Sequence, residues 1–202
     1  MVESKFSVSR KGILFVISGP SGVGKGTLTE MIVEQNHLQY SISATTRPPR
    51  VGEVQGKDYF FLERSDFEAM MAGDEFLEWA EVYGNYYGTP RRFVLDNLER
   101  GQDVLLEIDI QGAMQVKAKF PEGAFIFIAP PSEAELAQRL EKRGKDSSET
   151  IANRLLCYDK EMAQMANYDY VVVNDELEST MAQLIAIITA ERCRVVRFIG
   201  GG

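Results

Sequence analysis

The sequence contains few of the residues that build zinc centres and disulfide frameworks. Among its 202 residues there are two cysteines, Cys157 and Cys193, and one histidine, His37. Structural zinc needs about four such ligands, often with CxxC spacing that is absent here, so a cysteine and histidine zinc site is excluded. A disulfide framework is not expected either, and both cysteines are predicted to lie on helices as small apolar residues.

The chain also lacks a long hydrophobic run and an excess of positive charge. Its apolar runs have strand length, well short of the roughly 20 residues of a membrane helix, and residues 1–11 lack a signal-peptide core. Lysine and arginine total 22 against 30 acidic residues, a net charge of −8. We therefore expect a cytoplasmic protein that binds neither membranes nor nucleic acid over a broad basic surface. A small basic pocket for an anionic ligand is compatible with this total.

The pattern of apolar segments predicts one α/β domain. Strand-like runs occupy residues 12–18, 103–110, 123–129 and 168–174. Segments of helical periodicity occupy residues 27–35, 91–100, 132–143, 151–165 and 177–197. Strands that alternate with helices indicate a mostly parallel sheet flanked by helices. Between the first two strands lies a stretch of short polar segments, aromatic residues and turn glycines, which is typical of an inserted lobe.

The sharpest local motif follows the first strand. Residues 19–27 read GPSGVGKGT, with six positions before Lys25 as in the phosphate-binding loops of nucleotide hydrolases and kinases. Glycines let backbone N–H groups turn toward phosphate oxygens, and the helix that opens near Gly26 adds its positive end. The strict motif has Ser or Thr directly after the lysine, whereas here Gly26 intervenes before Thr27. This departure leaves direct magnesium ligation by Thr27 open.

A second basic segment lies in the expected lobe. Arg47 and Arg50 flank Pro48 and Pro49, and this proline pair excludes a helix. In an extended or turn conformation the two guanidinium groups can converge on one phosphate. Taken alone, the segment is equally compatible with a solvated loop.

Together with further ordered motifs, these segments resemble the guanylate kinases, which phosphorylate GMP from ATP. The resemblance runs from about residue 11 to residue 191. It rests on SGPSGVGKGT (18–27), SATTRPPRVGEVQGKDY (43–59), FLEWA (76–80), GNYYGTP (84–90), EIDIQGA (107–113), FIAPPS (127–132), RLEKRG (139–144), Arg154 and VVVND (171–175).

The resemblance implies an α/β phosphate-loop kinase that uses magnesium with ATP. A core of about residues 11–38, 96–138 and 157–198 would carry a GMP-binding lobe at 39–95 and a helical lid at 139–156. The implied ATP-binding residues are Gly19, Pro20, Ser21, Gly22, Val23, Gly24, Lys25, Gly26, Thr27, Arg139, Arg143 and Asn174. The implied GMP-binding residues are Ser43, Arg47, Arg50, Tyr59, Glu78, Tyr87, Thr89 and Asp109. Charge on the transferring phosphoryl group would be neutralised by Lys25, Arg47, Arg50, Arg143 and Arg154.

The residues assigned to the base suit guanine chemically. Guanine presents an N1–H and an amine as donors and O6 as an acceptor, which match two carboxylates and a hydroxyl. Glu107 and Asp109 are two positions apart on an expected strand and would point the same way. We assign Asp109 to guanine and keep Glu107, with Thr27, as a magnesium candidate, directly or through water. Outside this context two alternatives stay open: Glu78 as a helix-end carboxylate beside a core Trp79, and each lid arginine as an exposed helix charge.

Two other functions are open to a chain of this kind. One is a non-catalytic interaction module of the same fold, and the other is a kinase for a different phosphorylated acceptor, such as a ribose phosphate. The intact loop at residues 19–25 argues against the first, and the set of Glu78, Thr89 and Asp109 argues against the second. Whether the protein forms a homo-oligomer is left open.

Overall fold

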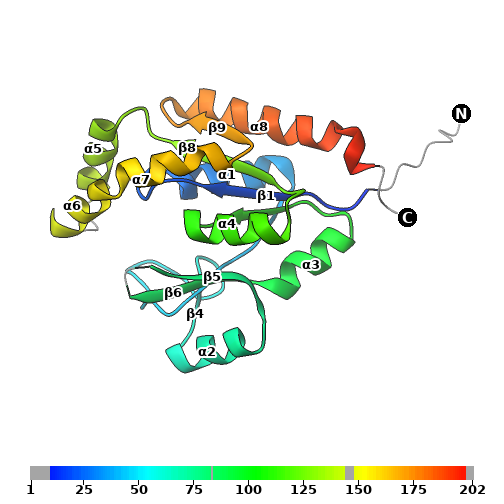
Figure 1. The fold of residues 1–202 in the computed structure, drawn as a ribbon, viewed down its shortest axis with the longest axis horizontal. Helices are drawn as coiled ribbons and strands as arrows, with labels where there is room; N and C mark the ends of the chain where they lie inside the picture. Colours follow the sequence, from blue (N-terminus) through cyan, green and yellow to red (C-terminus); the bar gives the residue numbers. More distant parts are fainter. Residues whose placement is uncertain (1–9, 83, 144–147, 199–202) are drawn as a thin grey trace, which may run out of the picture.

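A parallel five-stranded sheet forms the centre of the computed structural model, which describes residues 10–82, 84–143 and 148–198. Its strand order is β2-β7-β1-β8-β9, and the four pairings among these described strands are all parallel. The strands are β1 (Leu14–Ser18), β2 (Gln39–Tyr40), β7 (Val104–Glu107), β8 (Ala124–Ala129) and β9 (Tyr170–Val173). The predicted α/β fold with a mostly parallel sheet is confirmed (Figure 1).

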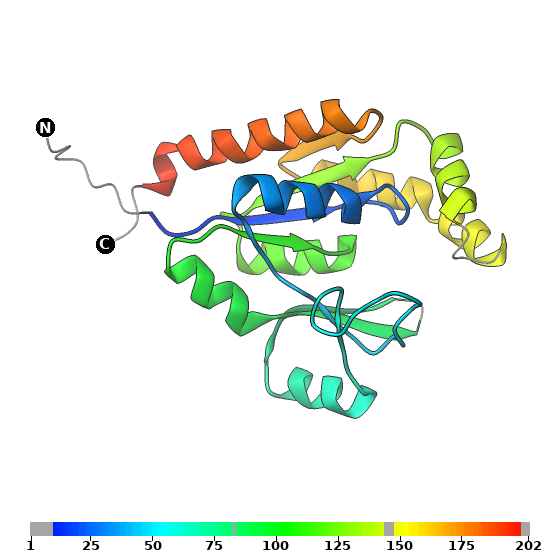
Figure 2. The same ribbon diagram turned by 180° about the vertical axis from the view of Figure 1, so that it is seen from behind.

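Helices cover both faces of this sheet because its strands are apolar on both sides. One face carries α1 (Lys25–Asn36) and α8 (Leu177–Cys193), and the other carries α3 (Arg91–Glu99) and α4 (Ile110–Lys119), as Figures 1 and 2 show. In β1, Phe15 and Ile17 pack in the cluster with α1 and α8, whereas Leu14 and Val16 pack in the cluster with α3 and α4. This alternation places β1 at the centre of the core, since successive strand residues face opposite sides.

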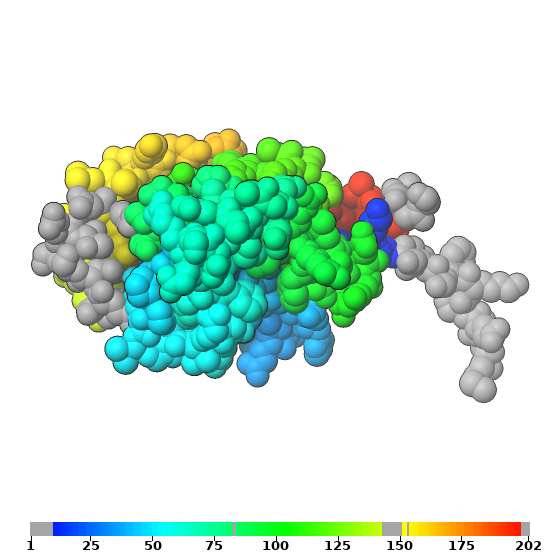
Figure 3. Space-filling model, turned by 90° about the horizontal axis from the view of Figure 1, so that it is seen from below, coloured from blue at the N-terminus to red at the C-terminus, as the bar shows by residue number. Residues whose placement is uncertain are grey.

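A second, mixed sheet forms a lobe that is inserted between β2 and α3. Its strands are β3 (Ala44–Thr45), β4 (Phe60–Phe61), β5 (Phe76–Val82) and β6 (Asn85–Pro90), in the order β4-β3-β6-β5. Phe67 of α2 (Arg64–Ala72) stacks on Phe76 and Tyr86, with ring centroids 4.4 Å and 5.4 Å apart. The lobe therefore has a small core of its own, and it covers much of the face seen in Figure 3.

The lobe begins slightly later than the sequence suggests. Gln39 and Tyr40, which the prediction includes in the lobe, pair with Val104 and Leu105 of the central sheet. The mixed sheet thus starts after β2.

The helical region between β8 and β9 consists of more separate elements than the sequence predicts. They are α5 (Glu133–Arg143), α6 (Ser148–Leu156), α7 (Tyr158–Ala163) and the 3₁₀ turn η1 (Gln164–Asn167). The single helix predicted over residues 151–165 is therefore wrong. At the exposed Cys157 the N–H bonds to the carbonyl of Arg154, three residues back, at 3.1 Å, which tightens the turn and interrupts the regular ladder.

The second predicted strand, residues 103–110, also ends early. Pairing with β1 stops at Glu107, and Asp109 then caps α4 by accepting the N–H of Gly112 at 2.7 Å. The strand alternation expected to orient Glu107 and Asp109 alike does not apply, because Asp109 belongs to a helix start. The last predicted helix ends at Cys193, before the 3₁₀ turn η2 (Val195–Arg197). Within the described residues, no helix has both the length and the apolar character that crossing a bilayer requires.

Asp103, just before β7, ties the two ends of the described chain to the sheet. Its side chain is 3% exposed and accepts hydrogen bonds from both terminal nitrogens of Arg10, from Arg192 Nε at 2.7 Å and from the N–H of Ile13 at 2.8 Å. Burial alone would raise the pKa of Asp103, but these hydrogen bonds hold it below its ordinary value of 3.8. The carboxylate is therefore stabilised in its charged form.

We expect Asp103→Asn to lower the free energy of unfolding at pH 7 by about 2 kcal/mol, because it removes a buried charge paired with two arginines. Since the folded pKa is lowered, this wild-type advantage exists above the unfolded value near 3.8 and is lost as the pH falls below it. Urea unfolding at about pH 7 and about pH 3 measures both effects. Asp175→Asn, at an exposed turn, is the control, and equal stability of wild type and Asp103→Asn at pH 7 would refute the anchoring role.

Candidate nucleotide site

The predicted phosphate loop joins the end of β1 to the start of α1. Gly19 has a φ of 143°, and a Cβ at this position would clash with the carbonyl oxygen of Ile128, so the turn requires glycine. Asn174, after β9, donates its amide nitrogen to the carbonyl of Val23 at 2.7 Å. This bond fixes the loop to the edge strand of the sheet, and the same amide group was expected to contact ATP.

Lys25 is the first residue of α1, and its side chain reaches back to the phosphate loop. Its ammonium donates to the carbonyl oxygens of Gly19 at 2.7 Å and Pro20 at 3.0 Å. Gly26 and Thr27 follow on the exposed first turn of α1. The loop therefore presents a cation, a helix start and a hydroxyl at one end of the sheet, the arrangement that suits an anionic ligand.

Glu107 lies between this loop and the lobe. Its two carboxylate oxygens are each 3.8 Å from the position that a Cβ at Gly26 would take. Burial raises the pKa of Tyr59 to about 12, and the charge of Glu107 adds to the effect. Burial and then Glu107 likewise raise the pKa of Tyr40. Among the described residues, no three or more acidic, histidine or cysteine side chains group closely enough to form a closed metal cage.

The lobe brings several of the predicted phosphate-binding residues together. Arg47 Nη2 pairs with Glu53 Oε1 at 2.9 Å, and its guanidinium carbon lies 5.5 Å from the centre of the Tyr59 ring. The rings of Tyr59 and Tyr87 meet edge to face at 6.0 Å. Ser43 precedes β3 and accepts the N–H of Phe60 through its carbonyl. A guanidinium group with tyrosine hydroxyls nearby offers the hydrogen-bond donors that a phosphate needs.

Glu53 is a member of this cluster that the sequence prediction omits. Besides pairing with Arg47, it accepts the N–H of Arg50 through Oε2 at 2.7 Å. Burial would raise the pKa of Glu53, but the bonds from Arg47 and Arg50 lower it. The carboxylate thus orders the loop that carries both arginines, while the Arg50 side chain is exposed. One feature of the sequence could have indicated this role. Glu53 lies three residues after Arg50 in a segment that cannot form a helix, where a turn can bring the two residues together.

The three residues predicted to bind guanine converge where the lobe meets the core. Glu78 is 4% exposed, and Thr89, opposite it on β6, donates its hydroxyl to Glu78 Oε1 at 2.6 Å. A Cβ at Gly112 would lie 2.9 Å from the carboxylate carbon of Glu78 and 3.4 Å from Asp109 Oδ1. Only a glycine on α4 allows the two carboxylates to approach the same spot.

Burial raises the pKa of Glu78 to about 7, and the charge of Asp109 adds to this shift. The hydrogen bond from Thr89 and the charge of Lys119 act in the opposite direction. Glu78 is therefore poised to change its charge near neutral pH, as groups at functional sites often are.

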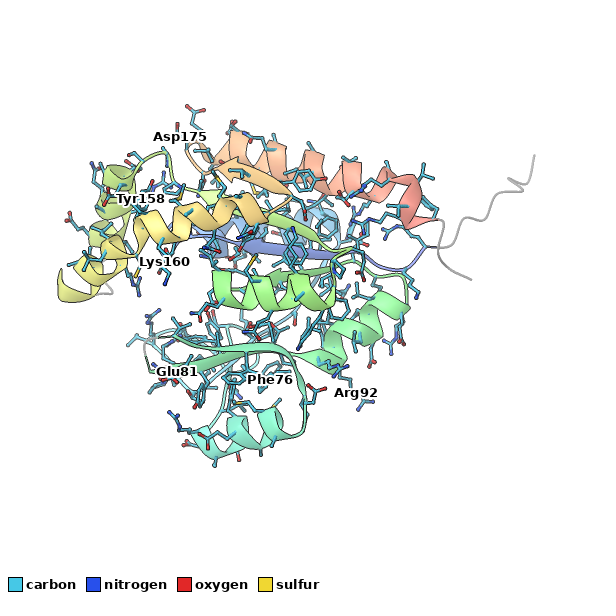
Figure 4. All side chains as sticks on the ribbon, viewed as in Figure 1. Phe76, Glu81, Arg92, Tyr158, Lys160 and Asp175 are labelled. Atoms are coloured by element: carbon cyan, nitrogen blue, oxygen red, sulfur yellow. The ribbon has the colours of Figure 1, made fainter. Side chains whose placement is uncertain are left out.

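The lid residues are only partly described. Arg139 donates to Glu135 at 3.0 Å and to the carbonyl of Asn174 at 2.8 Å, which holds it beside the loop. Arg154 lies on α6, whereas the side chain of Arg143 lies outside the described residues. Figure 4 shows α7, marked by Tyr158 and Lys160, on the core side, and β5, marked by Phe76 at its start and Glu81 near its end, in the lobe.

Glu161 of α7 is a second residue near the site that the sequence prediction omits. Burial raises its pKa, while the charges of Lys25 and Arg154 lower it and that of Asp109 raises it. These influences put Glu161 within electrostatic reach of the phosphate loop, the lid and α4 at once. No motif marks it, because the neighbours come from three distant segments.

Comparison with known proteins gives a consistent result. A family model described as guanylate kinase matches residues 11–191. The chain is 57% identical to a guanylate kinase of Syntrophomonas wolfei, over 93% of this chain and 97% of that protein. It is 55% identical to one of Caldanaerobacter subterraneus, over 95% and 93% of the two chains. A crystal structure of guanylate kinase from Anaplasma phagocytophilum superposes with a TM-score of 0.78 at 35% identity, over 96% and 93% of the two chains.

We expect GMP binding to strengthen about tenfold between about pH 6 and pH 8, because the ionised fraction of a group with a pKa near 7 rises about tenfold over this interval. Calorimetric titration of GMP measures the affinity. Glu78→Gln cannot titrate, so its dependence should be flatter and its affinity at pH 8 lower. The GMP phosphate, which ionises near pH 6, contributes to both proteins alike. Equally steep profiles for both would assign the titration to another group.

Proposed function

Because this chain belongs to the guanylate kinase family and transfers a phosphoryl group from ATP to GMP, giving ADP and GDP, we propose how its residues divide that reaction. The observation that carries the assignment is the convergence of Glu78, Thr89 and Asp109 at the boundary between lobe and core. Two carboxylates and a hydroxyl match the donors and acceptor of guanine, whereas adenine would leave buried groups unpaired.

ATP is proposed to bind at the phosphate loop. The backbone N–H groups of residues 19–24 and the first turn of α1 would hold its phosphates. Lys25 would exchange its bonds to Gly19 and Pro20 for a phosphate oxygen. Arg139 and Asn174 contact each other beside the loop. Their position supports the proposal that the remainder of ATP binds next to them. Arg143 is part of this proposal by resemblance alone.

The phosphate of GMP is proposed to bind in the lobe cluster. Arg47 and Arg50 would supply charge, and Ser43, Tyr59 and Tyr87 would supply hydroxyl donors. Glu53 supports this role because it orients Arg47 and the backbone of Arg50 without occupying the whole guanidinium fork.

Guanine binding would rearrange the bond between Thr89 and Glu78. The Thr89 hydroxyl proton now points to Glu78 Oε1. Turning this proton toward O6 of guanine would leave Glu78 to accept N1–H, with Asp109 available for the amine. Rotation of the Thr89 hydroxyl would thus free both Thr89 and Glu78 to bond with the base.

The transfer itself needs positioning and charge neutralisation. An ionised oxygen of the GMP phosphate attacks the γ-phosphorus of ATP, a new P–O bond forms, and the bond to the β-phosphate oxygen breaks to release ADP. The attacking oxygen is already deprotonated near neutral pH, so no strong base is required. Lys25, Arg47, Arg50, Arg143 and Arg154 would stabilise charge during transfer, as preorganised cations do.

Magnesium fits the oxygen donors near the loop. Thr27, on the first turn of α1, and Glu107, which faces Gly26 on the same turn, would hold the ion directly or through water. Two oxygen donors suit Mg²⁺, which keeps several waters and binds substrate phosphates. When bound, it would offset phosphate charge. We further propose that the chain is divided into a core, a GMP-binding lobe and a lid, and that the protein is cytoplasmic.

We expect Lys25→Ala to fold normally and to lose at least about 10²-fold in turnover, the scale of losing a key charge stabiliser. A coupled ADP-release assay with GMP, AMP, CMP and UMP measures both rate and base preference. Lys11→Ala, at an exposed position, is the control. Near-normal turnover of Lys25→Ala would overturn its catalytic role, and equal rates with all four acceptors would overturn the guanine assignment.

A further inference from the structure

The outer edge of β5 has no strand beside it among the described residues of the lobe sheet. In the order β4-β3-β6-β5, this strand pairs with β6 on one side and lies at the end of the sheet. The opposite side presents the main-chain groups of Leu77 and Trp79, which point away from β6. Such an edge normally bonds to water or to another strand.

Helix α4 of the core takes the place of the missing strand. The Gln115 side chain donates through Nε2 to the carbonyl of Trp79 at 2.8 Å and accepts the N–H of Trp79 at Oε1 at 3.4 Å. One turn further along, Lys119 Nζ donates to the carbonyl of Leu77 at 2.6 Å. Gln115 and Lys119 are four positions apart, so both lie on one face of the helix.

Between these two contacts lies Glu78. Its carboxylate meets α4 at Gly112, on the same helix face as Gln115, and Asp109 caps the start of that helix. Three successive β5 residues therefore touch one helix. The spacing between the two carboxylates is set by how α4 holds the strand edge, as well as by any base that binds between them.

We propose that Gln115 and Lys119 are positioning residues for guanine selection, which bind the open edge of β5 and thereby hold Glu78 against Asp109. This inference rests on the assignment of both carboxylates to guanine in the proposed function. Neither residue needs to touch the nucleotide. No motif in the sequence marks either residue.

The test compares GMP with inosine monophosphate, which lacks the exocyclic amine. In Gln115→Leu we expect the KM for GMP to rise about tenfold, which corresponds to the ~1.4 kcal/mol of one net hydrogen bond. The preference for GMP over inosine monophosphate should shrink, while the KM for ATP and the kcat at saturating GMP stay within about twofold. Both bonds between Gln115 and the main chain of Trp79 are exposed, so water can replace them and the variant should fold.

Three further variants separate a positioning role from a general loss of stability. Lys119→Met should shift the KM for GMP in the same direction, and Lys119→Arg, which keeps a donor, should restore it in part. Lys117→Met is the matched control, because Lys117 makes a similar bond at 2.7 Å to the carbonyl of Asn167 within the core. It should lower stability without changing base preference.

A double-mutant cycle decides whether Gln115 acts through Glu78. In a Glu78→Gln background, Gln115→Leu should no longer change the KM for GMP. An undiminished effect there, or an unchanged preference in Gln115→Leu and Lys119→Met, would overturn the positioning role. A wild-type protein without preference for GMP would instead overturn the guanine assignment itself, so the two failures are distinguishable.

Discussion

The meeting of β5 with the start of α4 is the constraint on which the candidate site depends. A carboxylate as buried as Glu78 is unfavourable unless hydrogen bonds or charges compensate for the lost water. Thr89 supplies one bond from the lobe, and the core supplies a glycine where the carboxylate can fit. Neither sheet could hold this group alone. The proposed selectivity for guanine would therefore depend on how the inserted lobe packs against a helix of the central domain.

The positive charges of the site are also paired with acidic side chains. The chain carries a net charge of −8, yet the cations that face the inferred phosphates are confined to the phosphate loop, the lobe cluster and the lid. Each described cluster contains an acidic partner, Glu53 beside Arg47 and Glu161 within reach of Lys25 and Arg154. Such partners keep like charges from repelling one another before a phosphate arrives. An acidic total is thus compatible with local clusters of cations at the site.

The parts that sequence could predict are those encoded by nearby residues. The run before the phosphate loop, its glycines and the following helix lie within about 25 positions, and the apolar strands are evident from composition. Glu161 and Gln115 were missed because their partners, the side chain of Lys25 and the main chain of Trp79, come from other segments. Glu53 lies only six residues from Arg47, but the conformation of the loop between them, which no periodic pattern predicts, brings the two side chains together. The start of α4 was misread as strand, since the apolar run into Ile108 and Ile110 conceals a cap made by the Asp109 side chain. Long-range pairing and capping are what local patterns leave undetermined.

Glu78 also links stability to function. Its folded pKa lies above the ordinary 4.5, so the folded protein binds a proton more tightly than the unfolded chain, and this residue lowers stability as the pH rises from 4.5 toward 7. A guanine base that donates to the ionised carboxylate would reverse that penalty, because the charged form would gain the partners that burial removed. Ligand binding would then stabilise the same packing of β5 against α4 that the free protein shows. The ionised form of Glu78 is destabilised by burial in the free protein and would gain hydrogen bonds when guanine binds. Its ionisation would therefore be coupled more strongly to base binding than that of a carboxylate whose hydrogen bonds are already complete.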